Sequence, residues 1–529
     1  MKKINPTAFL VILLVITTIT LFCTLTNGHD WGDDFSSYIM QAKSITELNP
    51  HGFIEANLFT VENSSYPYNG AIAAPWGFPF LLAPFYAVFG LNMIGLKLVG
   101  VISFLIFIVL LWVGFRKYHS PVWLLCLVCF FSLNPTMLSF TDQILSDLPF
   151  LLLSTASVLF MGRLIIEKRN LISPVWDYIL LGAIIAGAFF IRTNGILLLI
   201  TLAITQFIAL ALKLRRGNFP NGQCSTYFSN LLSDRGVFLK RLLINLIPYI
   251  FFFCIVVPWE VILPHEGTGH SSIFSDITID IIKNNLEFYI DLPSLFFIGV
   301  PHYNLFYFVS IPIAIAGIIR RYRYDYHIIV YIILTFVLYV LLASPLQGLR
   351  YLFPILPFYF SFVITGLEIF QGGKTNIEQK LRKWVCLIPI LIVLTYFGIN
   401  SIGNACTNMI HHRETISGPY TETSQSMFSF IRSNTEKESI IVFFKPRLMR
   451  MMTDRKSLML RKKEDLSRGD YLCLYPPTQL KVLAAQLRDQ VSPDTMQDLL
   501  KQEGALLIYE NSEFQVYKLT YSKIPFLNR

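Results

Sequence analysis

Charged residues are scarce in this chain of 529 residues, because only 15% of them are Asp, Glu, Lys or Arg. Soluble globular domains usually contain about 25%. Hydrophobic residues make up 54% of the chain, and its mean hydropathy is +0.54. This composition excludes a disordered protein and an ordinary soluble enzyme, and it predicts a polytopic membrane protein. Nucleic-acid binding is not expected, since the basic residues behind the net charge of +9 are scattered between apolar runs.

The sequence also lacks a disulfide framework, internal repeats and low-complexity segments. Five of its eight cysteines lie in apolar runs and are interpreted as small buried side chains: Cys23, Cys126, Cys129, Cys254 and Cys386. A histidine metal motif is not predicted either, because residues 265–270 (HEGTGH) have the wrong spacing for H-E-x-x-H and contain two glycines. No motif therefore requires a cofactor, and a divalent metal at acidic side chains is left open.

Eleven apolar runs are predicted to span a membrane, since each span needs about 20 predominantly apolar residues. They lie near residues 7–26, 93–115, 121–140, 148–166, 176–191, 196–212, 243–263, 301–319, 327–343, 351–370 and 384–401. The first run has no small-x-small cleavage site before Asp30 and is interpreted as an anchor. Only residues 192–195 separate the fifth and sixth runs, which predicts a tight hairpin at the outer face.

The distribution of basic residues predicts the orientation of these spans. With the N-terminus inside, the inner loops hold twenty Lys and Arg residues. The outer loops hold only Lys43, Arg192, Lys283 and Arg350. Because Lys and Arg are enriched on the cytoplasmic side, this asymmetry predicts an inner N-terminus and an outer C-terminus.

The two predicted outer regions differ in composition from the spans. The first outer loop covers residues 27–92, and its apolar segment 78–90 contains Pro79 and Pro84, which favours an interfacial or re-entrant helix. Residues 402–529 contain 18 Lys or Arg and 14 Asp or Glu, as in a soluble domain. Strands are predicted at 440–444, 471–475, 505–509 and 514–519, and helices at 446–452 and 479–490. The expected fold is thus a helical membrane module (1–401) followed by a small α/β domain outside the membrane (402–529).

Three carboxylates, Asp30, Asp33 and Asp34, begin the first outer loop, just before a helical pattern over residues 35–45. An aspartate in this place caps the helix or favours its positive end. Alternatively, it serves as a general base or a metal ligand at the membrane surface. Asp147 offers the same two interpretations, because it lies directly before the next span at the same predicted face.

Two arginines, Arg192 and Arg350, lie at that outer face against the charge rule. Arginines near span ends often extend towards lipid headgroups. A guanidinium is also suited to bidentate binding of phosphate, so both arginines are candidate ligands of a phosphate group.

Together these segments resemble the membrane-embedded glycosyltransferases of the GT-C class, and most closely the protein-mannosyltransferase-like family 39. That family includes the lipid A aminoarabinose transferase and the rhizobial core-oligosaccharide transferases. The resemblance extends over most of the chain and rests on the order and sidedness of several segments: Asp33-Asp34…Tyr38 with Ala42, Ala74-Pro75-Trp76-Gly77-Phe78-Pro79, Phe89-Gly90, Asp147, Gly182…Gly187…Arg192 and Arg350-Tyr351…Pro354…Pro357.

The resemblance implies transfer of a sugar from a polyprenyl-phosphate donor to a lipid, glycan or protein acceptor at the outer face, with inversion of the anomeric centre. It implies that Asp33 or Asp34 is the catalytic base and that Asp147 is the second acidic position. Arg350 and Arg192 would meet the leaving phosphate, and Asp30, Tyr38, Trp76 and Tyr351 would contact substrates. The implied location is a bacterial cytoplasmic membrane with the C-terminal domain in the periplasm. The chain lacks the lysine that some members carry before the Pro-Trp-Gly-Phe-Pro segment.

Three other functions compete with this interpretation. A flippase for lipid-linked sugars would be expected to show inverted repeats and charges near span centres, and the sequence shows neither. A non-catalytic scaffold leaves the acidic first loop unexplained. A polysaccharide polymerase or ligase would share the chemistry and differ in using a preassembled chain as its donor.

Overall fold

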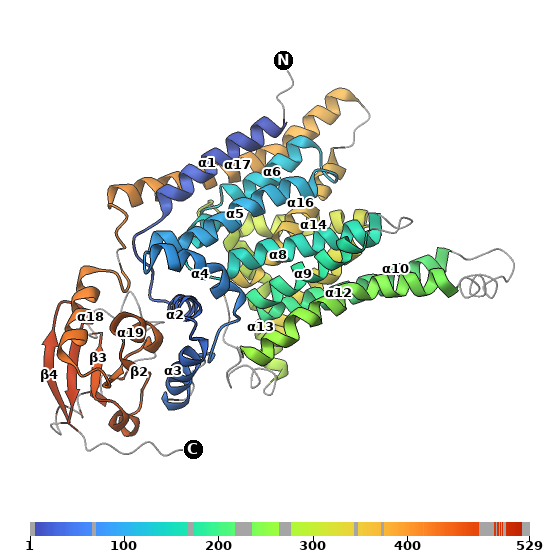
Figure 1. Ribbon diagram of the computed structural model, residues 1–529. Helices are drawn as coiled ribbons and strands as arrows, with labels where there is room; N and C mark the ends of the chain where they lie inside the picture. Colours follow the sequence, from blue (N-terminus) through green and yellow to red (C-terminus); the bar gives the residue numbers. More distant parts are fainter. Residues whose placement is uncertain are drawn as a thin grey trace.

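The computed structural model describes residues 6–65, 70–167, 174–216, 235–263, 277–342, 348–371, 375–415, 417–475, 491–492, 495–496, 498, 500 and 504–520. A large helical bundle and a small sheet domain make up the molecule (Figure 1). The first-loop helices α2 (Asp34–Thr46) and α3 (Pro50–Asn63) lie between the bundle and the sheet. The predicted helix at 479–490 and the HEGTGH segment lie outside the described residues.

Every predicted span corresponds to a helix. Within the described residues, eight helical segments are long and apolar enough to cross a membrane. They contain α1 (Pro6–Thr24), α5 (Met93–Phe115), α8 (Asp147–Met161), α10 (Ile196–Arg216), α12 (Arg235–Ile262), α14 (Tyr303–Arg321), α16 (Leu356–Phe370) and α17 (Asn376–Ile410). The protein is therefore a multi-pass membrane protein.

The other three predicted spans are broken or short. The helices α6 (Pro121–Ser132) and α7 (Pro135–Thr141) are bent by 51° at their junction. Pro135 lacks an N–H group, and the Asn134 side chain accepts a hydrogen bond from Met137 N–H at 3.0 Å, so a new helix begins at that point. The helices α9 (Val175–Ile191) and α15 (Tyr326–Leu341) are apolar, but they are shorter than the eight segments. Two of those segments, Asp147–Ile166 and Leu349–Phe370, extend beyond α8 and α16. The predicted total of eleven spans stays a prediction.

The helices differ in how much of their surface is buried and in which face is exposed. Apolar side chains of α1 are exposed along the face where lipid would lie, for example Val11 and Ile19. The segment Leu349–Phe370, which contains α16, is the most buried of the eight, because 78% of its apolar stretch is buried. This helix therefore lies inside the bundle. Cys126 and Cys129, spaced C-x-x-C along α6, are buried and free of disulfides, whereas Cys254 is exposed on α12, contrary to the prediction of burial.

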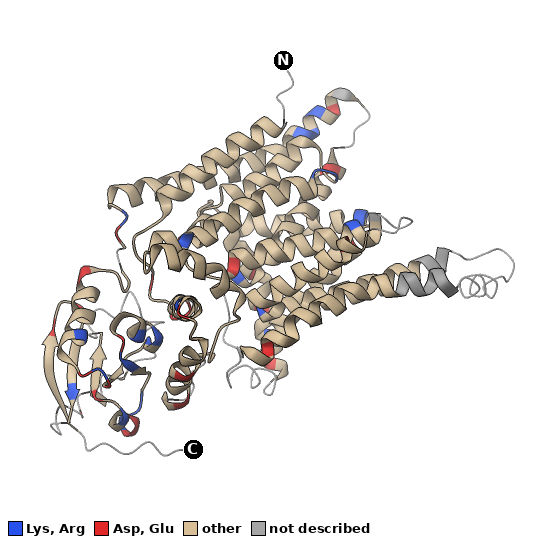
Figure 2. Ribbon diagram, in the orientation of Figure 1, with Lys and Arg blue, Asp and Glu red and all other residues tan. Residues whose placement is uncertain are grey.

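Lys and Arg residues gather at the helix ends farthest from the C-terminal sheet, including the start of α17 (Figure 2). This distribution agrees with the predicted orientation of the helices. The bundle also contains α13 (Ile279–Asp291) and the short helices η1 (Gly162–Glu167), η2 (Thr193–Gly195), η4 (Leu292–Phe297) and η5 (Leu349–Ile355). A further short helix, η6 (Lys463–Arg468), lies in the C-terminal domain. Because η2 joins α9 to α10, the predicted hairpin is present.

In the first outer loop, α2 matches the predicted helix, and α4 (Gly77–Phe89) matches the predicted apolar segment. The helix α3 was not predicted. Gln41 on α2 both donates to and accepts from the backbone of Ala74, at 2.9 and 3.0 Å. This pair of hydrogen bonds fixes α2 against the segment that leads into α4.

The C-terminal domain is a five-stranded mixed sheet in the order β2-β1-β3-β5-β4. Its strands are β1 (Ile440–Val442), β2 (Lys456–Leu458), β3 (Tyr471–Leu474), β4 (Ala505–Glu510) and β5 (Gln515–Leu519), with helices α18 (Glu422–Asn434) and α19 (Pro446–Thr453). The pairs β1–β2 and β1–β3 are parallel, and β3–β5 and β4–β5 are antiparallel. The sequence predicted α19 and four of the strands, and it missed α18 and β2. The predicted boundary at 401/402 falls within α17, which continues to Ile410.

Candidate active site

The ends of three elements bring Asp147, Arg192 and Arg350 together. Asp147 is the first residue of α8, Arg192 follows α9, and Arg350 lies in η5. The side chain of Asp147 is 2% exposed and forms ion pairs with Arg192 Nη1 and, at 3.8 Å, with Arg350 Nη1. A buried carboxylate needs such partners, and the N-terminus of α8 also favours its negative charge. Asp147 thus binds two arginines in addition to occupying the first position of α8.

Asp34 reaches the same cluster from α2. Its Oδ2 lies 3.5 Å from Arg350 Nη2, and its side chain is 54% exposed, so the carboxylate is open to a ligand. Behind it, the hydroxyl groups of Tyr38 and Ser146 form a hydrogen bond at 3.2 Å, which ties α2 to the residue before Asp147. Burial raises the pKa of Tyr38, and the nearby Asp34 raises it further, so its hydroxyl stays protonated.

Tyr351 lies under both arginines. The guanidinium carbons of Arg192 and Arg350 are 4.7 and 5.3 Å from the centre of its ring. Burial alone would lower the pKa of Arg192, but the Asp147 carboxylate and the other groups around the guanidinium together outweigh this effect and raise the pKa. Two guanidinium groups therefore remain charged at one place, where they are held by a ring and by carboxylates.

Asp33 does not face this cluster. It occupies the N-cap position of α2, but the described structure gives it no side-chain capping hydrogen bond. Its Oδ2 lies 3.7 Å from Nη1 of Arg447, a buried residue of α19 in the C-terminal domain. Arg447 also donates to the backbone oxygen of Ala71. The sequence predicted α19 but offered no signal that this helix would meet the first outer loop.

A second residue that sequence reasoning missed is Lys97, near the start of α5. Its ammonium group is completely buried and donates to Asp142 Oδ1 at 2.7 Å, to Thr26 O at 2.9 Å and to Gly28 O at 2.6 Å. Lys97 lies near the start of the predicted span 93–115, so it does not contradict the expected lack of charges near span centres. The signal was present in the sequence, since a lysine interrupts the apolar run MIGLKLVG.

Asp30 and Trp76 also lie away from the cluster. The Oδ1 atom of Asp30 is 2.7 Å from Nδ1 of His29, and its Oδ2 accepts from Gln143 at 3.4 Å. Burial opposes ionisation of Asp30, yet the hydrogen bond and charge of His29, together with Lys97 and Arg350, lower its pKa. Trp76 is buried at the start of α4, where it lines an apolar cavity.

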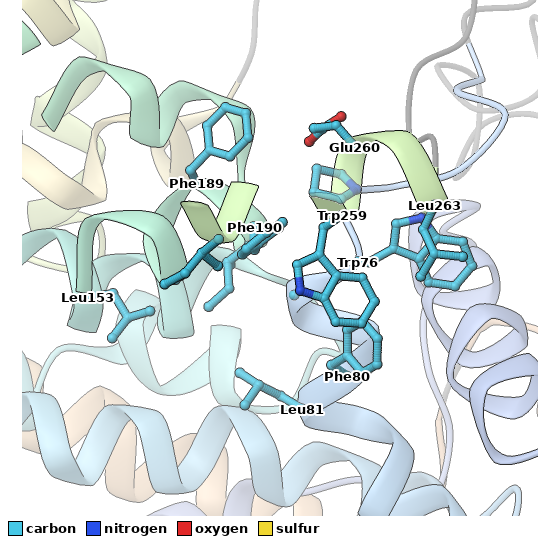
Figure 3. Close-up of a pocket in the computed structure, with 14 residues that line it drawn as sticks. Trp76, Phe80, Leu81, Leu153, Phe189, Phe190, Trp259, Glu260 and Leu263 are labelled. Carbon is cyan, nitrogen blue, oxygen red and sulfur yellow. The ribbon is translucent and has the colours of Figure 1, made fainter. Parts of the chain in front are cut away.

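This cavity has a volume of about 370 Å³ and lies between α4, α8, α9 and α12. The rings of Phe80, Phe190 and Trp259 line it, together with aliphatic side chains such as Leu153 (Figure 3). Its lining residue Ile191 directly precedes Arg192 of the charged cluster in the chain. Leu153 also lies on α8 six residues after Asp147, which is about 9 Å along a helix. An apolar chain and an anionic head could therefore bind side by side.

A metal site is not evident among the described residues, since no three His, Cys, Asp or Glu side chains lie close enough to hold an ion. Asp34 and Asp147 form ion pairs with arginines.

Comparisons with known proteins bear on the fold of the chain. Residues 73–221 match the model of the family described as dolichyl-phosphate-mannose-protein mannosyltransferase. This segment contains Trp76, Asp147 and Arg192. No curated protein matches the chain.

Solved structures match along nearly the whole chain. ArnT from Cupriavidus metallidurans, bound to undecaprenyl phosphate, is 13% identical with a TM-score of 0.58, and the match covers 97% of this chain and 98% of that one. The archaeal oligosaccharyltransferase AglB from Archaeoglobus fulgidus, in complex with an inhibitory peptide and a dolichol-phosphate, is 10% identical with a TM-score of 0.54. That match covers 98% of this chain and 75% of AglB. The chain has the fold of GT-C glycosyltransferases, and the predicted resemblance is confirmed.

Proposed function

We propose that the protein is a glycosyltransferase that moves a sugar from a polyprenyl-phosphate donor to an acceptor at the outer face of a bacterial cytoplasmic membrane. The carrying observation is the cluster of Asp34, Asp147, Arg192 and Arg350 beside an apolar cavity. The family match and the shared fold support the same reaction class, as does the lipid phosphate bound to ArnT and AglB.

In this proposal the two arginines bind the donor phosphate. Arg350 shares its guanidinium between two carboxylates at 3.5 and 3.8 Å, distances long enough to leave it hydrogen-bond donors for a phosphate. The prenyl chain lies in the cavity lined by Trp76 and Phe190. When the bond between the sugar and the phosphate breaks, the charge that develops on the lipid phosphate is stabilised by Arg350 and Arg192.

Asp34 is the proposed base, because its carboxylate is exposed within the cluster whereas Asp33 faces Arg447. It removes the proton of an acceptor hydroxyl, whose oxygen then attacks the anomeric carbon opposite the leaving phosphate. A single displacement of this kind inverts the anomeric centre. Asp147 holds both arginines in place.

The test uses purified protein and a set of polyprenyl-phosphate sugars, with release of polyprenyl phosphate followed by mass spectrometry. Each donor is incubated with and without host membrane extract. We expect release that depends on the extract and falls by about 10²–10⁴-fold in Asp34→Asn, because a positioned base contributes that much. Asp280→Asn, an exposed aspartate at the start of α13, serves as the matched control.

Three outcomes would contradict the proposal. Unchanged release in Asp34→Asn would remove Asp34 as the base. No release from any donor, with lipid-linked sugar crossing liposome membranes instead, would indicate a flippase. Release only from donors that carry a preassembled glycan would indicate a polymerase or ligase.

A further inference from the structure

A second cavity of about 270 Å³ shares no lining residue with the apolar one. It is enclosed by the end of α1 and the segment after it, by α7 and by the C-terminal part of α17. Figure 1 shows α1 and α17 along one side of the bundle and α9 and α12 along the opposite side. The helices that line the two cavities therefore lie towards different sides of the bundle.

Most residues that line this second cavity carry polar side chains, although their carbon atoms contribute the larger part of its surface. Of its fourteen lining residues, all except Pro135 and Leu138 carry polar side chains, including Asn404, Asn408 and Gln143. Hydroxyl and amide groups both donate and accept hydrogen bonds, which suits a ligand with several hydroxyl groups. The apolar surface of Pro135 and Leu138 offers a contact for the C–H face of a sugar ring.

Electrostatics exclude a phosphate from this place. Asp30 and Asp142 supply two carboxylates to the lining, and the fourteen described lining residues include no Lys or Arg. Lys97 compensates Asp142, but its ammonium group is buried and already donates to three oxygens besides Asp142. A neutral or cationic ligand is therefore favoured over an anionic one.

Two lining residues of the cavity, Asp30 and Gln143, are close in sequence to the reacting groups. Gln143 and Asp30 are hydrogen-bonded to each other at its wall, at 3.4 Å. They lie four residues before Asp147 and Asp34 respectively, a stretch of chain that spans at most about 14 Å. Its volume is at the lower end of that of ligand pockets, so a small group fits best.

We infer that this polar cavity binds a neutral or cationic carbohydrate unit, either the sugar that is transferred or the sugar of the acceptor that receives it. The inference rests on the proposed transferase function, and it adds a site for the hydroxyl-bearing part of a substrate beside the apolar site for the lipid.

Direct binding tests the cavity without any assumption about turnover. Saturation-transfer difference NMR is recorded on the purified full chain in detergent with free glucose, mannose, galactose and glucosamine. We expect signals from at least one sugar and their loss in Asn404→Phe, whose ring would fill the cavity. Thr407→Phe, an exposed position on α17 that does not line the cavity, is the matched control and keeps the signals. Gln143→Leu removes one hydrogen-bonding group and weakens binding by about fivefold to tenfold.

Steady-state transfer assays then identify the source of the sugar. A higher KM for the acceptor in Asn404→Phe supports the acceptor sugar, and a higher KM for the donor supports the transferred sugar. Equal NMR signals in all variants, or unchanged KM values for both substrates, would overturn the inference. If the wild-type protein binds sugars in the cavity but releases no polyprenyl phosphate, the proposed function fails while the cavity assignment stands.

Discussion

Asp33 and Asp34 are neighbours in the chain, yet they contact different parts of the molecule. Asp34 lies beside Arg350 of the helical bundle, and Asp33 lies beside Arg447 of the C-terminal domain. Successive residues at the start of a helix point in different directions, about 100° apart, so one residue faces the cluster and the other faces the sheet domain. At this scale the two carboxylates are expected to have different functions.

We predict that Asp33 positions α2 and does not itself react. Asp33→Asn and Arg447→Gln should each lower kcat by about tenfold to a hundredfold, because a shift of about 1 Å can cost that much. The double variant should be no worse than either single variant, since both remove the same ion pair. The measurement is a double-mutant cycle on kcat, with Lys456→Gln as the control in an exposed ion pair of the same domain. If the effects of Asp33→Asn and Arg447→Gln on kcat add fully in the double variant, the ion pair between the two residues does not explain the loss.

A pH prediction follows from Asp30, whose pKa is lowered by the hydrogen bond and charge of His29 against the effect of burial. A depressed carboxyl pKa stabilises the folded state above the ordinary value of 3.8, and this contribution is lost as the pH falls through the lower folded value. Asp30→Asn should therefore lower the Tm at pH 6. The effect should be at most about 1 kcal/mol, since the side chain is 55% exposed.

Thermal unfolding of wild type and Asp30→Asn between pH 6 and pH 3 measures this effect, and the two Tm values should converge as the pH falls. Asp280→Asn should show no such gap. A difference that grows towards low pH would contradict the assignment.

At the scale of elements, Lys97 joins three segments that are distant in sequence. It links α5 to the segment after α1 through Thr26 and Gly28, and to the segment after α7 through Asp142. Thr26 also donates to Asp142 from both its backbone and its side chain. The segments that lead into α2, which begins with Asp34, and into α8, which begins with Asp147, are therefore fixed to one another.

We predict that Lys97→Met destabilises the protein strongly, by about 3–5 kcal/mol, because it leaves the Asp142 carboxylate without its cation. Lys97→Met combined with Asp142→Leu should recover part of this loss, since the uncompensated charge is then gone. Tm in detergent is the measurement, and Lys43→Met, at an exposed ion pair on α2, is the control. A double variant less stable than Lys97→Met would contradict this account.

At the scale of the whole molecule, the C-terminal domain completes the surroundings of the first outer loop. The ring of Trp31 lies 5.4 Å from that of Phe444 and 5.9 Å from that of Phe514. Further along the loop, Ser65 donates to Asp465 at 2.8 Å. The sheet domain is thus bound to the segment that carries Asp34, and its position bears on the geometry of the cluster.

Trp31→Ala should cost about 3–5 kcal/mol, as expected for removal of a buried Trp side chain. We expect faster hydrogen exchange in α2 and α19, measured by mass spectrometry, because the loop and the domain then separate more often. Trp176→Ala, at a position that is 75% exposed on α9, should leave both helices unchanged. Protection that is lost only within the transmembrane helices would contradict this role for Trp31.

Much of this architecture was predictable because its signals are local. Apolar runs such as 93–115 identify helices without reference to their neighbours, and the pattern from Phe35 to Ile45 predicted α2. The two outer arginines stood out because they broke the charge rule. By contrast, β2 (Lys456–Leu458) lacks the apolar run that identified the equally short β1, and Arg447 looks like any arginine near a helix start.

The sequence by itself determined a multi-pass helical protein with a mixed α/β tail and a set of acidic and basic candidates, because hydrophobicity and helix signals act over a few residues. Only the tertiary structure decided which candidates meet. It brought Asp34, Asp147, Arg192 and Arg350 together, turned Asp33 towards Arg447 and buried Lys97 against Asp142. The physical reason is that an ion pair depends on the packing of whole elements, and spacing along the chain does not specify how distant elements pack.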